Sequence, residues 1–576
     1  MTEQNSTTCM TERTHSTLDR TPIQRADVCI VGSGPSGALI AYELSRVGHD
    51  VVVLEAGKRF DIADRLNRME RELRPSHSWI DIWDMDNEKN RYENAGNVAY
   101  PVNVQRVKGV GGSTLHWGGT VARFLPKDFE MNSRWGLASD WPIAYSDVRP
   151  YYAAAESELG VAGTDDNPDG PPRENPYPME GFPRSHMDEM FADACESLGI
   201  SVRTEAHARN SEPYDDRSPC VGYGTCSPVC PSGAKYSADT HVRKAEANGT
   251  RVIDRATVQR FDHGDDGRHI EAAVYETPDG RTHRQSAEQF VLAAGGIENP
   301  RLLLLSESEA HPDGLANASG LVGKNLMDHR YIGLVGELDV PTEQNQIGFN
   351  TMGSWEHYEP ENAPPGSFTL AFQNKAGPGV VDLAINQRSP LRSLRNTVSE
   401  PTLDALSDLD RGTEPIEWGD ELLDTISRQY GNYFRINASV EVLPHTENQV
   451  RLSDSKTDAF GNPVPVVDWG YTSDYAEQTE QRAYEVMEKI VSELDAEVQW
   501  TERTEWFGGV AHSSGTTRMG DDPDESVVSP NLRTHEVDNL YVCGSSTFVT
   551  LSANQPTLTI AALALRLAEH LDENVL

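Results

Sequence analysis

The chain has 576 residues, too many for one simple core, so we expect two domains or one elaborated domain. Ninety acidic residues against 50 basic residues give a formal net charge of −40, which is spread along the whole sequence. This charge argues against nucleic acid and anionic membranes as partners, and no apolar run is long enough to cross a membrane.

The distribution of the acidic residues, with far more Arg than Lys, is typical of a halophilic surface solvated in concentrated salt. An acidic protein from an ordinary environment has the same balance. Residues 1–24 are polar, with neither a basic n-region nor an apolar h-region, so we expect a disordered tail rather than a signal peptide. The expected location is therefore cytoplasmic, or membrane-associated or exported through a partner subunit.

Residues 27–57 read DVCIVGSGPSGALIAYELSRVGHDVVVLEAG and predict a strand, a turn, a helix and a second strand. The strands are expected over Val28 to Val31 and Val51 to Leu54, and the helix over about Ser36 to Val47. This order is typical of a βαβ unit that binds a dinucleotide.

Each residue of the turn has its own task in such a unit. Gly32 makes the tight turn, Gly34 lets the backbone approach a pyrophosphate beside Pro35, and Gly37 packs the helix on the strand. The diphosphate then lies at the helix N-terminus, where unpaired N–H groups point at it. Glu55, 18 residues after Gly37, is placed to accept hydrogen bonds from ribose hydroxyls.

Residues 58–100 are polar with weak periodicity, which indicates a lid or excursion from the nucleotide domain. A glycine-rich stretch follows at 108–119, KGVGGSTLHWGG, which contains Gly112, Ser113, His116 and Trp117. So many glycines let the backbone lie against something flat, although a flexible loop has the same composition.

Three cysteines, Cys220, Cys226 and Cys230, follow a loop-rich region with one helix at 187–198. Their C-x5-C-x3-C spacing, with Pro231 after the last, resembles iron–sulfur ligation more than a zinc site, which favours four ligands in paired spacing. Three thiolates favour a three-iron cluster. A disulfide with one free cysteine is the main alternative.

The segment 241–330 continues the nucleotide domain. We expect a strand from Arg251 to Val258, a hairpin within 268–292, and a buried strand at 289–293 that ends in a glycine turn before a helix at 301–305. Segments 366–372, 433–443 and 449–453 alternate apolar and polar residues, which predicts an antiparallel sheet with one open face. An acidic insertion lies at 399–424, and a long helix is expected at 474–493.

The last block begins with AHSSGTTRMG at 511–520, which contains His512. A strand over Leu540 to Cys543 ends at Gly544 and Ser545, and SANQPT at 552–557 opens a helix to about His570. Pro556 suits a helix start, because its missing N–H is no loss there. The helix start at Pro556 and Thr557 can stabilise negative charge on a reduced cofactor ring.

Five blocks together resemble the glucose–methanol–choline (GMC) oxidoreductases, which bind FAD. They are VGSGPSG with Glu55, GGST at 111–114, AAGGIENPRLLLLS at 293–306, VGKNLMDH at 322–329, and the C-terminal HSSGTTRMG with SANQPTLTIAALALRLAEHL. The resemblance implies an α/β fold of two domains: a Rossmann-like FAD-binding domain and a substrate domain with a mainly antiparallel sheet. We place the FAD-binding domain at 25–57, 101–125, 241–330 and 505–576, a connecting region at 126–240, and the substrate domain at 331–504.

The resemblance also implies roles for single residues. His512 aligns with the catalytic histidine of the family and Asn554 with its His/Asn partner. His116 falls where the similar pyranose oxidases attach flavin covalently, and a non-covalent flavin contact explains the same residue. Further FAD contacts are expected at Val258, Ala294, Gly544 and Ser545. The cysteine segment resembles that of the flavoprotein subunits of gluconate, glucose and fructose dehydrogenases, where three cysteines hold a [3Fe–4S] cluster.

These features predict an FAD-dependent dehydrogenase that oxidises a hydroxyl group of a sugar, sugar acid or polyol. Neutral His512 would take the hydroxyl proton while a hydride passes to flavin N5, and Asn554 would hold the same oxygen. Electrons would leave through the cluster to a cytochrome, a quinone or a small-subunit partner. The alternatives are a cluster-free alcohol or choline dehydrogenase or oxidase, and a non-catalytic flavin- or zinc-binding scaffold subunit.

Overall fold

The computed structural model describes residues 19–72, 79–85, 90–165, 170–343, 350–359, 366–374, 376, 380, 418–503 and 510–576. Most of the expected N-terminal tail and of the 399–424 insertion lies outside these residues. No helix in the described parts of the chain combines the length and the apolar character that a membrane crossing needs.

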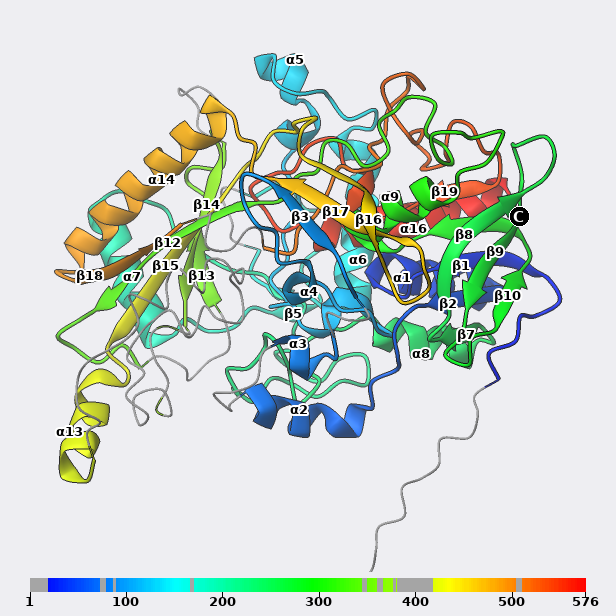
Figure 1. Ribbon diagram of the computed structural model, residues 1–576. Coiled ribbons are helices and arrows are strands. Elements are labelled where there is room, and N and C mark those ends of the chain that lie inside the picture. Colours follow the sequence, from blue (N-terminus) through cyan, green and yellow to red (C-terminus); the bar gives the residue numbers. More distant parts are fainter. Residues whose placement is uncertain are drawn as a thin grey trace, which may run out of the picture.

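A five-stranded parallel sheet forms one half of the molecule, on the right of Figure 1. Its order is β19-β11-β1-β2-β7, with the bounds β1 (Ala26–Val31), β2 (Val51–Glu55), β7 (Arg251–Asp254), β11 (Ala287–Leu292) and β19 (Leu540–Val542). All five residues of β2 are buried, as expected for a parallel strand whose two faces are both covered. Helix α1 (Pro35–Val47) packs against both α8 (Asp239–Ala247) and α16 (Thr557–Asn574). The βαβ prediction is confirmed, within one residue at most ends.

One expected strand is in fact two. The run from Arg251 to Val258 divides at Arg255, which has a positive φ of 53°. Residues before it form β7 in the parallel sheet, and residues after it begin the antiparallel sheet β10-β9-β8, with the bounds β8 (Thr257–His263), β9 (Ile270–Glu276) and β10 (Thr282–Gln285). Two hydrogen bonds hold this turn in place, because the backbone N–H groups of Arg255 and Ala256 donate to the carbonyl oxygens of Gly57 and Glu55, respectively.

A six-stranded antiparallel sheet forms the other half of the molecule. Its order is β18-β12-β15-β14-β13-β6, with the bounds β6 (Arg203–Thr204), β12 (Arg330–Glu337), β13 (Asn350–Ser354), β14 (Phe368–Gln373), β15 (Tyr433–Val440) and β18 (Glu497–Glu502). Its apolar face packs under α7 (His186–Ser197) and α14 (Asp474–Glu493), at the left of Figure 1. The predicted antiparallel sheet is confirmed, and the helix predicted at 474–493 has those bounds.

The segment 449–453 does not belong to that sheet, contrary to expectation. It begins β16 (Gln449–Thr457), which pairs with β17 (Pro463–Trp469), and β17 pairs in parallel with β3 (Glu93–Gly96). The end of the 58–100 excursion is therefore a strand. Val450, Val467 and Trp469 form a small core with Ile297 of α9 (Gly295–Leu305), so this sheet packs against the half that contains the parallel sheet.

The connecting region 126–240 is divided between the two halves. Helix α6 (Tyr145–Leu159) packs on α16, whereas α7 and β6 belong to the six-stranded sheet and its helical layer.

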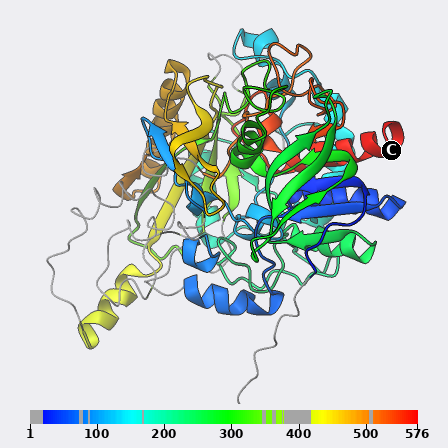
Figure 2. The same cartoon turned by 45° about the vertical axis from the view of Figure 1, so that its right-hand side comes forward.

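Helix α13 (Asp420–Gln429) projects from the body in both views (Figure 1 and Figure 2). The remaining short elements are η1 (Ile62–Asp64), α2 (Arg65–Glu72), α3 (Trp79–Ile82), α4 (Val102–Gln105), η2 (Gly112–Leu115), η3 (Pro126–Phe129), α5 (Met131–Trp135), β4 (Ala162–Gly163), β5 (Met179–Glu180) and η4 (Ser545–Thr547).

Candidate active site

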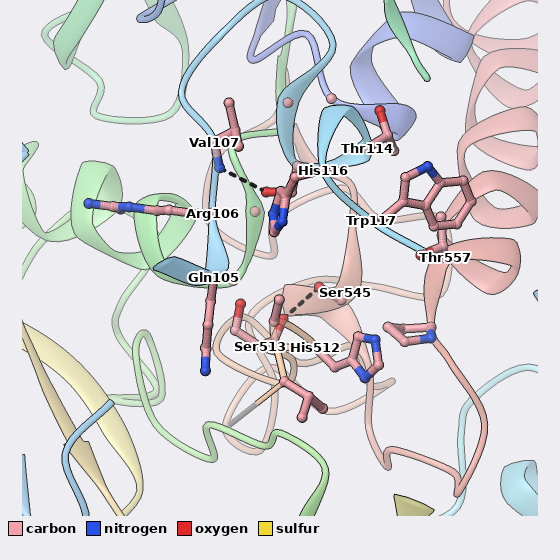
Figure 3. Close-up of a pocket in the computed structure, with 18 of the residues that line it drawn as sticks. Gln105, Arg106, Val107, Thr114, His116, Trp117, His512, Ser513, Ser545 and Thr557 are labelled. Atoms are coloured by element: carbon pink, nitrogen blue, oxygen red, sulfur yellow. Dashed lines mark hydrogen bonds between the residues drawn. The ribbon is translucent and has the colours of Figure 1, made fainter. Parts of the chain in front are cut away.

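A cavity of about 540 Å³ runs from the glycine turn after β1 to the six-stranded sheet. Its wall is built from chain segments far apart in sequence: the turn at 31–36, the glycine-rich stretch, the start of α9, residues 510–513 and the start of α16. Figure 3 shows His116 and Trp117 on one side of this cavity and His512 with Ser513 on another.

The glycine turn has the backbone that a bound diphosphate requires. Gly32 has a φ of +101°, and a Cβ there would lie 2.5 Å from the carbonyl oxygen of Ala293. A Cβ on Gly37 would lie 2.1 Å from the Gly32 oxygen, so helix and strand touch there. A Cβ on Gly34, in contrast, would meet nothing within 4 Å. Gly34 is also the N-cap of α1 and leaves the first N–H groups without a side-chain cap, open toward the cavity.

Glu55 ends β2 at the same place. Its carboxylate accepts hydrogen bonds from the backbone N–H of Ser33 at 3.0 Å and from that of Gly57 at 2.8 Å. Burial raises the pKa of this carboxyl group. Glu55 therefore fixes the turn, and it also lines the cavity, where its remaining lone pairs can accept from a ligand hydroxyl.

Nearly all the residues expected to bind cofactor line this one cavity. They are Gly32, Gly34, Pro35, Glu55, Gly112, Ser113, His116, Trp117, Val258, Ala294, Gly544, Ser545, Pro556 and Thr557. Gly37 lies behind the wall, where it makes the helix–strand contact. The positions of these residues fit the predicted roles, which stay predictions until a ligand is bound.

His116 is buried in the wall, and burial lowers its pKa to about 3, with Lys235 adding to the effect. Next to it, the indole N–H of Trp117 donates to the carbonyl oxygen of Tyr236 at 2.8 Å. This bond fixes the glycine-rich stretch against the segment that carries the cysteines.

His512 lies at the other end of the cavity, in contact with His329. The Nδ1 atoms of the two rings are 2.7 Å apart, and the rings cross at 87°. His329 Nε2 lies 2.5 Å from the carbonyl oxygen of Ser552. Burial lowers the pKa of His329 to about 4 and that of His512 well below its ordinary value, so both rings are neutral near pH 7.

These contacts determine which nitrogen of His512 holds its proton. A carbonyl oxygen can only accept, so His329 Nε2 carries the hydrogen and His329 Nδ1 is an acceptor. His512 must then donate from Nδ1, which leaves His512 Nε2 with a free lone pair. The pair of histidines thus presents a base at a defined atom.

Asp328 holds the loop that carries His512. Its carboxylate accepts from the backbone N–H groups of Val510 and His512, each at 3.2 Å, and from the hydroxyl of Tyr100. No single-residue role was predicted for Asp328 and His329, which lie in the VGKNLMDH block. Their adjacency was the available signal, because such a pair offers a carboxylate and an imidazole to one site.

No hydrogen bond joins Asn554 to His512 among the described residues. The Asn554 side chain is buried, and its Nδ2 donates to the Arg123 carbonyl oxygen at 3.3 Å. Its neighbour Gln555 lines the cavity, whereas Asn554 does not. The predicted role of Asn554 as the partner of His512 stays a prediction, and the ring in contact with His512 is that of His329.

The six-stranded sheet turns its polar face to the cavity. On β15, Arg435, Asn437 and Ser439 line the cavity, whereas the residues between them pack under the helices. Strands β12 and β14 alternate in the same way, so Tyr331, Val335, Thr369, Ala371 and Gln373 also line it. The alternating pattern predicted an open face but did not identify these residues. The polar positions in RINAS at 435–439 were the signal.

Two polar atoms of this face have no hydrogen-bond partner. Asn437 Oδ1 and Trp500 Nε1 are buried in the cavity wall without a hydrogen-bond partner. Arg435 is paired instead, because it donates to Glu502 at 2.9 and 3.0 Å, and Asn437 Nδ2 donates to the same carboxylate at 2.8 Å.

The three clustered cysteines lie directly behind the His116 segment. All three are free thiols, so the disulfide alternative finds no support here. Ser227, between Cys226 and Pro228, lines the cavity and donates to the His116 carbonyl oxygen at 2.9 Å. A cofactor in the cavity and a group on the cysteines would therefore be neighbours.

The surroundings of the thiols favour negative charge. Arg209 is buried and donates to Cys226 Sγ at 3.3 Å, and Lys235 is buried and donates to the Cys226 carbonyl oxygen at 2.7 Å. Burial opposes ionisation of Cys230, but the N–H and the charge of Lys235 outweigh it and lower the pKa of this thiol. Burial raises that of Cys220.

A single metal ion fits these cysteines poorly. Tetrahedral sulfur ligands of one zinc ion lie about 3.8 Å apart. Among the described residues, only Asp328, His329 and His512 bring three ligand atoms within 4.8 Å of one another, and hydrogen bonds account for that approach. Cys220, Cys226 and Cys230 form no such group, so at least one pair of their sulfur atoms lies more than 4.8 Å apart.

Comparison with known proteins agrees with this architecture. Two family models, each described as GMC oxidoreductase, match residues 92–331 and 444–564, and one described as FAD dependent oxidoreductase matches residues 27–63. The large subunit of fructose dehydrogenase from Gluconobacter japonicus is 34% identical, over 94% of this chain and 97% of that protein. The 2-methyl-1,2-propanediol dehydrogenase of Mycolicibacterium austroafricanum is 27% identical, over 96% of both.

More distant similarities extend the comparison. The gluconate 2-dehydrogenase flavoprotein of Pantoea cypripedii is 23% identical over 96% of this chain and 94% of that protein. The crystal structure of pyridoxine 4-oxidase from Mesorbium loti superposes with a TM-score of 0.64 at 19% identity, covering 96% of this chain and 100% of that one. At that identity the match concerns the fold.

Proposed function

This chain belongs to the GMC oxidoreductase family, whose members are FAD-dependent oxidoreductases of CH–OH groups, and we propose that it is a dehydrogenase of a neutral sugar or polyol. The observation that carries the proposal is the pairing, in one cavity, of a base at His512 with a polar sheet face. The relatives named for fructose and for a propanediol support the same class of substrate.

The unpartnered polar atoms favour a substrate rich in hydroxyl groups. A buried polar atom without a partner is costly, and a hydroxyl can both donate and accept. Asn437 Oδ1 needs a donor, and Trp500 Nε1 needs an acceptor. Substrate hydroxyls would supply both at once, whereas a purely apolar alcohol would leave both atoms unsatisfied.

The charge on the same face favours a neutral substrate over a sugar acid. Arg435 is the cationic group of the sheet among the described residues of the cavity wall, and its Nε and Nη2 atoms donate to Glu502. Glu502 already offsets the charge of Arg435 and lines the same cavity, so a carboxylate substrate would lie close to a second, buried carboxylate. A neutral substrate avoids this repulsion.

The cavity fits FAD at the residues that were expected to hold it. The diphosphate would lie at Gly34 and the start of α1, and Glu55 would hold the ribose. When bound, FAD supplies the acceptor for the hydride that leaves the substrate carbon. His512 Nε2 takes the hydroxyl proton, and the polar face of the sheet orients the substrate. His116 lies at the cavity as a contact for the ring system, and a covalent bond there stays a prediction.

We further propose that Cys220, Cys226 and Cys230 hold a [3Fe–4S] cluster. Arg209 and Lys235 offset its negative charge, and Ser227 ties the cysteine segment to the cavity wall. Such a cluster supplies one-electron transfer to an acceptor outside the chain, for which a cytochrome, a quinone or a haem-bearing subunit is suitable. The reaction is then that of a dehydrogenase.

Substrate screening tests the proposal. Aldoses, ketoses, polyols, aldonates and choline are supplied to the FAD-loaded protein in concentrated salt, with an artificial dye as acceptor. Dye reduction with a neutral sugar or polyol is the expected result. Preference for aldonate or choline would contradict the assigned substrate class, and rapid hydrogen peroxide formation without iron would favour the oxidase reading. No substrate-dependent flavin reduction, with zinc in place of iron, would favour the scaffold reading.

Substituting Gly34 separates a ligand contact from a folding requirement. Gly34→Ala places a methyl group in open space, so the apoprotein is expected to keep its melting temperature. A diphosphate against this backbone would clash with the methyl group, at a cost of about 1 to 3 kcal/mol, or about five- to 150-fold in FAD affinity. Titration of apoprotein with FAD by fluorescence measures the effect. Unchanged affinity would place the diphosphate elsewhere.

Substituting His329 tests the tautomer. His329→Leu removes the acceptor for His512 Nδ1–H and is expected to lower kcat/KM about tenfold to hundredfold through loss of positioning. His329→Gln can donate to Ser552 and accept from His512, so it should restore most of the activity. Since His512 has a lowered pKa in the native protein, the acid limb of kcat/KM lies below pH 6.5, and it should move in His329→Leu only. Equal loss in both variants would reduce His329 to a packing role.

A further inference from the structure

A second cavity, of about 370 Å³, lies outside the proposed active site. We name it the arginine cavity after Arg123, Arg173 and Arg203, which line it together with Tyr177 and Trp355. The loop 170–176, rich in proline, forms its rim. None of these residues lines the FAD and substrate cavity.

Two of the arginines share one carboxylate. Arg123 donates to both oxygens of Glu156 at 2.8 Å, and Arg173 donates to the same two oxygens at 2.7 and 2.8 Å. Four N–H groups thus occupy Glu156, which is buried. One negative charge therefore faces two positive charges, and Glu156 has no capacity for the third arginine.

Arg203 has no such carboxylate. Its side chain is 4% exposed, and its Nε and Nη1 atoms are buried without a hydrogen-bond partner. Glu205 lies 3.8 Å from Nε, too far for a hydrogen bond, and burial raises the pKa of Glu205. The guanidinium lies 3.4 Å from the centre of the Trp355 ring, which fixes its plane at the cavity wall.

Unpartnered donors also remain on the other two arginines. Arg123 Nη1 and Arg173 Nε are buried without hydrogen-bond partners. Asp165, 3.6 Å from Arg173 Nε, and Glu174, which pairs with Arg149, also line the cavity but are more than half exposed. The buried part of the cavity wall therefore has more hydrogen-bond donors than acceptors, in a chain whose net charge is −40.

We propose that the arginine cavity binds a small oxyanion, a phosphate or a carboxylate group carried by a small molecule. A guanidinium presents parallel N–H donors that match two oxygens of such a group, and Arg203 has two donors free. The acidic surface repels anions in general, so only a built site of this kind would retain one. The carbonyl oxygen of Arg123 also accepts a hydrogen bond from the Asn554 side chain, so the arginine cavity adjoins the loop that precedes α16.

Thermal unfolding of the FAD-loaded protein tests the proposal independently of activity. Potassium phosphate, citrate and acetate are each added at constant total ionic strength, which potassium chloride makes up. A saturable rise in Tm of about 2 °C or more is expected with at least one oxyanion, and titration calorimetry should give one site per chain. The phosphate and carboxylate arms identify the source of the oxyanion.

Variants assign the effect to this cavity. Arg203→Gln should abolish the rise in Tm, and Arg203→Lys, which keeps the charge without the fork, should retain less than the native protein. Arg268→Gln removes an exposed arginine from the surface and should leave the rise intact. If Arg203→Gln does not fold, Arg173→Gln gives the same comparison. A rise that does not saturate, or one that Arg203→Gln retains, overturns the proposal.

Discussion

His512→Ala is expected to lower the rate constant of flavin reduction by substrate about 10²- to 10⁴-fold, while the FAD content stays native. The loss follows from the proposal that Nε2 of this ring, which lines the cavity, is the general base, because removing a general base has a cost of that size. Stopped-flow absorbance of the bound flavin, in the absence of any acceptor, measures the step directly. Reduction at the native rate would refute the assignment.

A matched control and a double variant sharpen this test. His283→Ala removes a histidine of β10, outside the cavity wall, and should leave the rate unchanged. Since His329 acts through His512, adding His329→Leu to His512→Ala should slow reduction no further. Additive losses would mean that His329 acts on the substrate by a path of its own.

Cys226→Ser is expected to remove the proposed iron–sulfur cluster and to stop turnover with one-electron acceptors. Cys226 is the buried member of the three thiols and receives a hydrogen bond from Arg209, so its substitution removes one of the three proposed ligands. Iron content and the spin-one-half resonance of an oxidised three-iron cluster should both vanish after anaerobic preparation. Reduction of the flavin by substrate should persist, because the base and the FAD residues are untouched.

Cys195→Ala is the control for this experiment. Cys195 is a buried free cysteine of α7, in the core under the six-stranded sheet, and should have no part in iron binding. Iron content unchanged in Cys226→Ser would contradict the cluster. Zinc in the native protein at one ion per chain would assign the cysteines to a structural metal instead.

The two halves of the molecule differed in how far local pattern predicted them. The strands β1 and β2 are largely apolar runs, and backbone contacts leave no room for a Cβ at Gly32 and Gly37 between them. Because these constraints act over 30 residues, they could be identified without knowledge of the rest. The antiparallel strands gave an equally clear alternation, but alternation does not say which strands pair.

Pairing was the source of the main errors. The segment 449–453 has the pattern of the six-stranded sheet, yet it pairs with β17 and so joins β3, more than 350 residues earlier. The strand expected from Arg251 to Val258 broke at Arg255, because the backbone is bound there by Glu55 and Gly57 of the first βαβ unit. Both outcomes depend on partners that are distant in the sequence.

By itself, the sequence determined the dinucleotide turn, the alternating sheet and the cysteine spacing, and it predicted His512 as the base, because each depends on residues close together in the chain or on the order of motifs. Only the tertiary structure decided what acts on them. His329 meets His512 across 183 residues, Ser227 meets His116 across 111, and Arg435 meets Glu502 across 67. The physical reason is that contacts between side chains decide which nitrogen holds a proton, which donors have no partner and which charges are neutralised. These contacts form only when the chain folds.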